Sequence, residues 1–522
     1  MKEKGYAMIW KIAKKEFLLN IITFKFAVGT IVCVVLTAVF VPILAKDYQQ
    51  RVKTYHENVA RNQAELRKVM VYMNITPTIF RKPSVMSVFS EGLEKRIAES
   101  VTIELDKVPE MKAAAAQGNP YQAIFSIFDT MLIFKIVIGV LALLFAYDAV
   151  SGERERGTLK MMLSGTTRRY EVLMGKLLSG LLVLVVPVTI VFILGLIILL
   201  SFPLIDLTGS DWVLIGFMYL ASLIFTSLMY NLGLLFSCLT KKSSISLVLG
   251  LFLWIMFVVV IPNGSVYLAA EMRQLESPEK MEAQLAAINQ DYQAELEKNK
   301  VNRTVERAES DATDAFGRGY KRLLNKDFME YLQESYRLQY PVRIRYADRF
   351  RGVEDGYFNS MYGQKKLADT LSRISPVSLY ENVMSSLAGT DIAVFQRFMD
   401  SVRAYRAEIL EYVQSRTEGF SSSSFFTPCT QEEVEQYEKL MTQLQQVKSP
   451  EEAKSIVGNA KERWEKVFAE TPSLDLSDFP AFKSPGAFGN LERAVPDLGL
   501  LIFVDILFFA VAFTAFARYD IR

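Results

Sequence analysis

Long apolar runs alternate with charged segments along the chain, and this alternation is its dominant pattern. An apolar helix of about 17 to 25 residues is long enough to span the hydrocarbon core of a bilayer. Six runs meet this requirement, so the pattern predicts an all-α polytopic membrane protein with six transmembrane helices. The predicted spans are residues 21–45, 123–148, 173–202, 212–239, 245–262 and 497–517.

Two long polar regions separate these spans, and both are predicted to be mainly helical extracytoplasmic domains. The first polar region is residues 46–122 and the second is residues 263–496. From Tyr48 to Met73, mostly apolar side chains recur at alternating steps of four and three, which is heptad spacing with one polar interruption at Asn62. Either a force-transmitting helix that continues the first span or a packed domain core explains this spacing.

The second polar region also contains a short run of serines followed by two aromatic residues, Phe425 and Phe426. Small polar residues in a row are typical of loops. We therefore expect a flexible external loop here, and a binding role for the two aromatic side chains is the less favoured interpretation.

A charged segment, residues 149–172, interrupts the apolar pattern between the second and third spans. Its side chains from Glu153 to Arg156 alternate in sign, so this stretch cannot lie in lipid. Gly157 is suited to end one helix and Thr158 to cap the next, and Gly165 with the following threonines repeats this signal. The pattern predicts one or two short helices lying across the mouth of a membrane bundle.

The distribution of lysine and arginine predicts the orientation of the chain. Both residue types are concentrated in residues 1–20, 149–172, 241–242 and 518–522, whereas the loop 203–211 has none. Short loops rich in these residues stay in the cytoplasm. We therefore expect a bacterial cytoplasmic membrane protein with both termini and the charged segment inside. Residues 1–20 alternate lysines with apolar residues, which predicts an amphipathic helix lying against membrane lipids.

The composition argues against several classes of function. A formal net charge of only +2 gives no basic field for nucleic acid. The single histidine, His56, argues against histidine metal sites and against Ser-His or Cys-His catalysis, so no catalytic residue and no metal ligand is assigned. Gly152 and Gly157 have the spacing of a phosphate-binding loop, but Lys-Ser/Thr does not follow, so we exclude nucleotide binding. The cysteines are expected to be small buried side chains without disulfides: Cys33, Cys238 and Cys429.

Two charged residues fall inside predicted spans, Lys135 and Asp505. Charges at this depth are costly in lipid and face protein, water or each other. Both lie on the order of 10 Å inside the outer ends of their spans, at 1.5 Å per helical residue. We therefore predict a Lys135–Asp505 ion pair, and the alternative is a polar lining of a transport path.

Several stretches together resemble the ABC-2 type permease subunits of ABC transporters, in the branch with large external domains. That branch is similar to the permeases of gliding motility and of nitrous-oxide-reductase maturation. Three stretches carry the resemblance: residues 151–159 with 175–176, residues 375–379 with 387–391, 398 and 405–406, and the closing residues 516–522. Residues 81–92 also look like the first external domain of this branch. Each motif is weak by itself, but their order and spacing are fairly specific.

The resemblance implies two permeases, identical or sister chains, above two ABC ATPase subunits. ATP and magnesium would bind to the ATPase, with no cofactor in this chain, and an extracytoplasmic protein is a further expected partner. The charged segment would be the coupling element that the ATPase receives, through rim charges that tune docking. The residues expected to take part are Glu153, Arg154, Glu155, Arg156, Gly157, Thr158, Leu159, Arg168 and Arg169.

The resemblance thus implies a non-catalytic subunit that couples ATP hydrolysis to export of an amphiphile or peptide, or to mechanical work on an external partner. The charged segment has a simpler alternative, a solvated loop whose arginines only fix topology. A membrane-anchored receptor or scaffold without an ATPase is the alternative function. An intramembrane enzyme is disfavoured, because the sequence has neither paired intramembrane carboxylates nor an HExxH motif.

Overall fold

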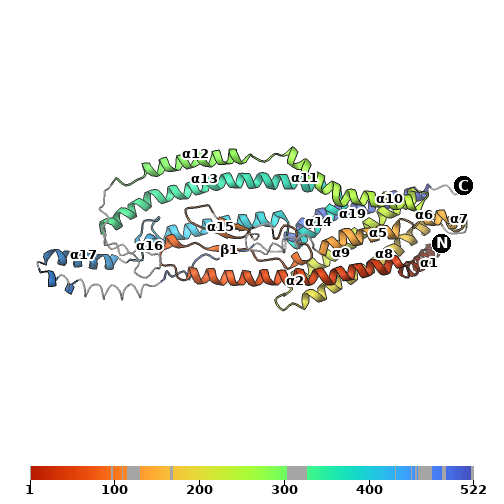
Figure 1. Cartoon of the computed structure of the whole chain (residues 1–522), viewed down its shortest axis with the longest axis horizontal. Coiled ribbons are helices and arrows are strands. Elements are labelled where there is room, and N and C mark those ends of the chain that lie inside the picture. Colours follow the sequence, from red (N-terminus) through yellow and green to blue (C-terminus); the bar gives the residue numbers. More distant parts are fainter. Residues whose placement is uncertain are drawn as a thin grey trace.

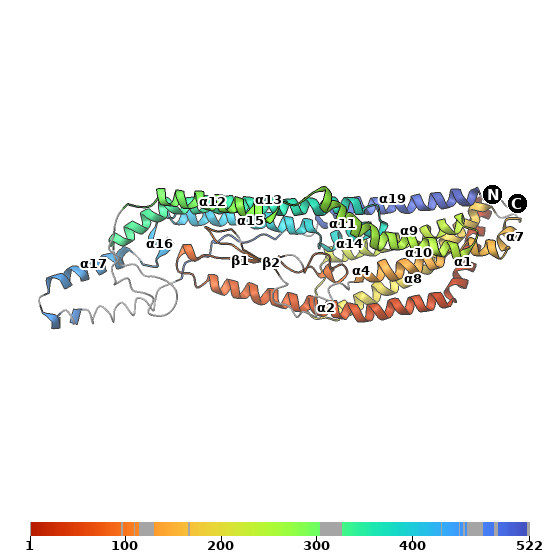
Figure 2. The same cartoon turned by 45° about the horizontal axis from the view of Figure 1, so that its top comes forward.

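The computed structural model describes residues 2–95, 98–108, 110–113, 130–164, 168–302, 326–429, 431–447, 449–452, 455–456, 473–484 and 489–518. The described chain is elongated (Figure 1). Helix α1 (Lys2–Ile21) and the C-terminal part of α19 (Gly489–Ala517) lie at one end, and α17 (Gln431–Gln446) lies at the other (Figure 2). We call these the terminal end and the distal end.

Six helices of the described chain are long and apolar enough to cross a membrane, which confirms the predicted fold class. Two of these spans contain a π-helical turn, η4 in the second and η5 in the fifth. The six are α2 (Phe24–Leu66); α4 (Thr130–Leu132) with η4 (Ile133–Ile138) and α5 (Gly139–Ala146); α8 (Arg169–Leu200); α9 (Gly209–Leu239); α10 (Ser243–Ile255) with η5 (Met256–Val260) and α11 (Ile261–Met272); and α19.

Helix α9 is the centre of the bundle, because α5, α8, α10 and α19 all pack against it. The contact with α8 is close enough to require glycine. A Cβ atom at Gly180 would lie 2.1 Å from Cζ of Tyr230, whose ring occupies that space. The Tyr230 hydroxyl is satisfied there, since it donates a hydrogen bond to the Lys176 carbonyl over 3.0 Å. All three cysteines are buried, as predicted.

Helix α2 continues past the membrane-spanning length to Leu66, so the helical part of the heptad prediction is confirmed. The later positions are not on this helix, because Met73 lies in the 3-10 turn η1 (Tyr72–Asn74). The polar interruption, Asn62, donates to the Thr78 carbonyl and accepts from the Thr78 amide, both over 3.1 Å. Asn62 therefore ties the helix to a strand, which favours a packed domain core.

The strand bound by Asn62 belongs to a small antiparallel sheet that the hydrophobic pattern did not predict. Its order is β1 (Thr78–Phe80), β2 (Ala98–Thr102) and β3 (Glu110–Ala113). The 3-10 turn η2 (Val85–Val88) follows β1. These strands are only three to five residues long, so they carry little periodicity.

The distal part is otherwise helical, with α12 (Pro278–Lys298) packed along α13 (Lys326–Ser372) and with α15 (Ile392–Arg416) beside the sheet (Figures 1 and 2). The predicted flexible loop at Phe425 and Phe426 is wrong. Both residues lie in a short helix, α16 (Ser423–Phe426), and both are buried. The Phe425 ring packs on Tyr340 with 4.7 Å between ring centroids, so these aromatics build the distal core.

One helix of the second polar region, α14 (Pro376–Ala388), packs into the membrane bundle against α9 and α19. Ser375 caps its first turn, and Gly389 ends it with a φ of 67°, a conformation that favours glycine. Its Tyr380 ring stacks on Phe225 of α9 with 4.5 Å between centroids. Helix α14 thus joins the distal part to the spans.

Candidate functional site

The charged segment forms two short helices at the terminal end, as its sequence predicted (Figure 1). They are α6 (Ser151–Glu155) and α7 (Thr158–Ser164), and Gly157 joins them with a φ of 73°. This φ is left-handed, which explains why a glycine separates the two helices. The second predicted helix signal, at Gly165 and the two threonines after it, lies outside the described residues.

The start of α6 is fixed to α9 by one serine. The Ser237 hydroxyl oxygen accepts hydrogen bonds from the backbone amides of Val150 over 2.9 Å and of Ser151 over 3.0 Å. The Ser151 hydroxyl in turn donates to the Tyr147 carbonyl over 2.7 Å. Because the first amides of a helix have no intrahelical acceptor, Ser237 satisfies groups that burial would otherwise leave unpaired.

A buried ion cluster, which we call the terminal cluster, holds the charged segment to the bundle. It consists of Glu16 on α1, Glu153 on α6 and Lys176 on α8. The Lys176 ammonium lies 2.7 Å from Glu153 Oε1 and 3.4 Å from Glu16 Oε1, and its side chain is 3% exposed. A lone buried ammonium is very costly, so the two carboxylates make this position possible.

Two arginines of the predicted set bind backbone carbonyls at the C-terminal ends of two neighbouring spans. Arg154 Nη1 donates to the carbonyl of Thr240, at the C-terminal end of α9, over 2.7 Å. The Arg169 guanidinium donates to the carbonyl of Ala517, at the end of α19. The last carbonyls of a helix carry partial negative charge, so a cation stabilises them.

The rest of the charged segment is a small exposed surface. Met161 is 76% exposed, although it is apolar. Leu159 is fully buried beneath α7 and anchors it. We call the exposed surface the docking face, and its members are Glu155, Arg156, Gly157, Thr158, Lys160 and Met161.

The predicted coupling residues therefore divide into two groups. The docking face includes Glu155, Arg156, Gly157 and Thr158, and Arg168 is exposed beside it. The inward group, directed to the protein, is Glu153, Arg154, Leu159 and Arg169. Of the nine predicted coupling residues, those of the first group are therefore the ones exposed to a partner.

Sequence reasoning missed the partners that anchor the segment. Lys176 follows Gly175 in the motif of residues 151–159 with 175–176, but no role was assigned to it from the sequence. A Cβ atom at Gly175 would lie 2.7 Å from Ile12 Cγ2, so this glycine lets α1 approach α8 closely. That approach brings Glu16 to Lys176. A lysine in the first turns of an apolar span was the available signal.

The predicted Lys135–Asp505 pair is wrong. The Lys135 ammonium lies 2.7 Å from Glu381 Oε1 of α14. Asp505 instead accepts hydrogen bonds from Ser227 over 3.0 Å and from Asn231 over 2.7 Å, both on α9. Each charge finds a partner on the helix packed against it, as a low-dielectric environment requires.

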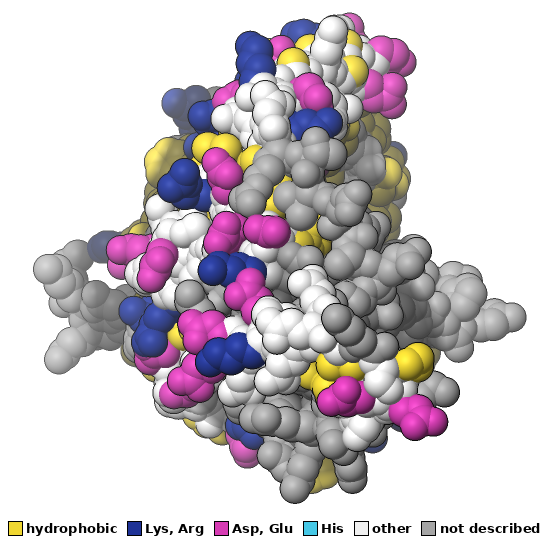
Figure 3. Space-filling view, turned by 90° about the vertical axis from the view of Figure 1, so that its left-hand side faces the viewer, with side chains coloured by type: hydrophobic (Ala, Val, Ile, Leu, Met, Phe, Trp, Pro, Cys, Tyr) yellow, Lys and Arg dark blue, Asp and Glu magenta, His cyan; other side chains and the backbone are white. Residues whose placement is uncertain are grey.

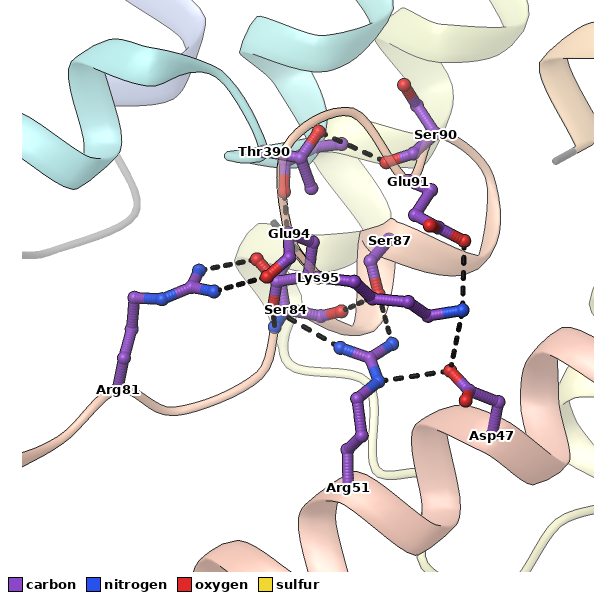
Figure 4. Close-up of polar contacts among 11 residues, drawn as sticks. Asp47, Arg51, Arg81, Ser84, Ser87, Ser90, Glu91, Glu94, Lys95 and Thr390 are labelled. Carbon is purple, nitrogen blue, oxygen red and sulfur yellow. Dashed lines mark hydrogen bonds and ion pairs between the residues drawn. The ribbon is translucent and has the colours of Figure 1, made fainter. Parts of the chain in front are cut away.

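A second ion cluster, the junction cluster, joins α2 to the chain that follows β1 (Figure 4). It consists of Asp47, Arg51, Arg81, Glu94 and Lys95. The Glu94 side chain is 1% exposed and lies 2.5 Å from Arg81 Nη1 and 3.4 Å from Arg51 Nη1. Arg51 also contacts Asp47 over 3.1 Å, and Lys95 reaches the same carboxylate over 3.2 Å. The cluster therefore locks α2 to the chain that follows β1.

Two hydrogen bonds, one of them from a side chain, connect the loop of this cluster to the end of α14. The Leu93 amide donates to the Thr390 carbonyl over 2.8 Å, and the Thr390 hydroxyl donates to the Ser90 carbonyl over 3.1 Å. Burial raises the pKa of Glu91 in the same loop, and the nearby Lys95 partly opposes this shift. Within the described residues, no group of three metal-ligating side chains is arranged to hold a metal ion.

These features define a multi-pass membrane protein. It has an anchored, charged surface, the docking face, at the terminal end of the molecule. The family model for the ABC-2 family transporter protein matches residues 10–415. The chain belongs to this family, and membership supports a permease subunit of an ABC transporter. The family implies an ABC ATPase as partner, usually with the permease as a dimer. A search of curated proteins finds no match.

Proposed function

We propose that the chain couples ATP hydrolysis by a separate ATPase to the export of an amphiphile. ATP and magnesium belong to that ATPase, and a second permease completes the bundle. The observation that carries this proposal is the docking face, which is exposed and charged and yet rests on the buried terminal cluster. A solvated loop that only fixes topology has no need of such an anchor.

The orientation is part of the proposal. The docking face would lie in the bacterial cytoplasm beside both termini, and the distal part would lie outside. The distribution of lysine and arginine supports this orientation. The positive charge of Arg156, Lys160 and Arg168 would meet acidic groups of the ATPase, while Met161 would enter an apolar depression, since interfaces gain most of their energy from a few such anchors.

Movement of α6 and α7 would reach the spans through two contacts. Lys176 connects α6 to α8 and α1, and Ser237 connects α6 to α9. Helix α9 packs against α14 and α19, which continue into the distal part. The contacts form a continuous path of packed elements, which is a physical basis for coupling between distant sites.

Co-purification tests the proposal. Isolated from native membranes, the chain should bring an ABC ATPase with it. Met161→Glu should lower the recovered ATPase about tenfold, the loss expected for one interface anchor. Met361→Glu is the matched control, because Met361 is an exposed methionine on distal helix α13, and it should leave recovery unchanged.

A preparation of the native chain with neither ATPase nor ATP turnover would refute the proposal. Gly157→Pro is a further test on the intact complex. Proline cannot adopt the positive φ of this position, so ATP hydrolysis should become uncoupled from transport while the spans stay inserted.

A membrane-anchored receptor or scaffold is the second candidate, and the size of the distal part favours it. Acidic and basic side chains are intermingled on the distal face, with apolar side chains between them (Figure 3). Such a surface suits a protein partner outside the membrane. This candidate predicts that altering Glu153, Gly157 or Thr158 leaves function intact.

A further inference from the structure

A groove of about 560 Å³ opens on the side of the molecule between the bundle and the distal part. Its lining comes from α11, α13, α14 and α19, together with α4, η4 and the loop at residues 91–93. No role assigned above uses this space. It lies away from the docking face, which is at the terminal end.

The groove lies at the level of a bilayer surface. Pro262 lines it, about 29 Å along the fifth span from Ser243 at 1.5 Å per residue. Asp497 also lines it, about 30 Å along α19 from Ala517. The hydrocarbon core of a bilayer is about 30 Å thick. Both residues therefore mark the boundary where lipid headgroups begin.

Helix α14 presents two different faces, and its polar face lines the groove. Its apolar face, which includes Tyr380 and Val383, is buried in the bundle core. The polar face consists of Ser378, Glu381, Asn382, Ser385 and Ser386, at the i, i+3, i+4, i+7, i+8 spacing of one helix side. The polar face of this amphipathic helix thus forms one wall of the groove.

One hydroxyl on that wall is buried without a hydrogen-bond partner. Ser378 is 3% exposed, and its Oγ makes no hydrogen bond to any described residue. Buried polar groups are nearly always satisfied, so this hydroxyl, on a residue that lines the groove, has capacity to donate to a ligand group or a water molecule. Arg493, also on the lining, has a buried Nη1 that is likewise without a partner among the described residues.

One cation of the lining has no ion-pair partner among the described residues. Among the described residues, Lys366 forms no ion pair, and its side chain is exposed at the groove. Every acid of the lining already has a basic partner. The pairs are Glu91 with Lys95, Asp369 with Lys365, Glu381 with Lys135, Asp391 with Arg493, and Asp497 with Arg373. The lining carries as many acids as bases, because Lys95 is not part of it, and Lys366 is the lining cation that is left to pair with an anion.

The rim of the groove is apolar. Val266 lines the groove and is strongly exposed on α11. Ile374 is strongly exposed directly after the lining residue Arg373. Apolar side chains exposed at the bilayer boundary contact acyl chains at no cost.

The geometry points to a binding site for an amphiphile with an anionic, phosphate-bearing head and acyl tails. This inference rests on the function proposed above and names the substrate class of that export. The head would lie along the polar face of α14, with the phosphate near Lys366 and accepting from Ser378. The tails would lie against Val266 and Ile374.

The test uses the purified full-length chain in nanodiscs that contain phosphatidylglycerol with a photoreactive head. Irradiation should label peptides of α13 and α14. Lys366→Glu should reduce this labelling by at least about fivefold, because the loss of one lysine near an anionic lipid surface accounts for about that factor and the new carboxylate adds repulsion. Ser378→Ala should also reduce it, because alanine removes the hydroxyl and adds no bulk at this buried position. Lys298→Glu, an exposed lysine on α12 away from the groove, should label like the native chain.

Each remaining outcome decides the proposal. Equal labelling of the native chain and Lys366→Glu would overturn it, and so would equal labelling by phosphatidylcholine of the same design. Competition by soluble glycerol phosphate as strong as by phosphatidylglycerol would show a site for free anions and overturn the lipid assignment. The assay contains no ATP and no ATPase. If the native chain is not labelled but still brings the ATPase with it, only the lipid site in the groove is refuted. If the native chain is labelled but brings no ATPase with it, only the proposed function is refuted.

Discussion

The terminal cluster and the junction cluster are opposite solutions to the same problem. In the terminal cluster one buried cation, Lys176, lies between two carboxylates. In the junction cluster one buried carboxylate, Glu94, lies between two guanidinium groups. Both arrangements let a charge be buried by surrounding it with opposite charge. The two clusters therefore differ less in chemistry than in what they hold.

The difference lies in the surrounding restraints. The junction cluster sits on a long helix and on a loop bound to Thr390 and to the Ala388 carbonyl, to which Ser84 donates over 2.7 Å. The terminal cluster holds α6 and α7, two short helices whose outer side is exposed. Segments with few buried contacts open most easily. Similar ion pairs thus hold the junction region rigidly, whereas at the terminal end they only tether α6 and α7.

The largest expected effect is at the junction cluster. Glu94→Ala would leave Arg51 and Arg81 facing each other with their shared carboxylate removed. Breaking a buried pair costs about 3 to 5 kcal/mol, and we expect about 3 kcal/mol of lost unfolding free energy because both arginines are partly exposed. Thermal unfolding of the purified protein in detergent measures this loss.

The matched control is Glu57→Ala. Glu57 is also on α2 and faces Lys53 at 3.9 Å, but both side chains are more than half exposed. Its effect should stay within about 0.5 kcal/mol. Equal losses for the two variants would show that the junction cluster is not a lock.

The spans and the charged segment could be predicted because their signals are local. Twenty apolar residues in a row, or alternating charges between two such runs, need no knowledge of the neighbours. The burial of Phe425 and the insertion of α14 could not be predicted. Both depend on which distant helix lies opposite, and α14 is only an amphipathic helix within a polar region.

The candidate site was predicted as a segment, but its anchoring was not. Glu153 was expected at the surface because the resemblance makes residues 149–172 the segment that meets the ATPase, whereas its partner Lys176 is 23 positions away. The Lys135–Asp505 prediction failed for a related reason. The equal depth of Lys135 and Asp505 gives only their position along the membrane normal. A contact also requires that the two side chains lie on facing sides of their helices. Glu381 comes from a helix not predicted to be in the bundle.

The middle effect is at the terminal cluster. Lys176→Met would leave Glu153 and Glu16 without their cation, and we expect about 2 kcal/mol of lost stability because Glu16 is partly exposed. Hydrogen exchange should rise mainly in α1, α6 and α7, since the tether is local. Lys160→Met is the control, because Lys160 is exposed on the docking face and should change exchange little. A uniform rise through the whole bundle would mean that the terminal cluster is a second lock.

The smallest effect tests whether the segment is tethered in a particular shape. A Cβ atom at Gly157 would meet no atom within 4 Å, so Gly157→Ala costs only the strain of a φ of 73°, about 1 kcal/mol. Gly209→Ala is the matched control, because that site is equally open and its φ is not in the left-handed region. Alanine there should be neutral or slightly stabilising. Proteolysis rates at the 155–160 turn, with thermal unfolding alongside, distinguish the two variants. If Gly157→Ala left both measurements unchanged, the turn between α6 and α7 would already be free to rearrange, and the docking face would have no fixed shape for a partner to recognise.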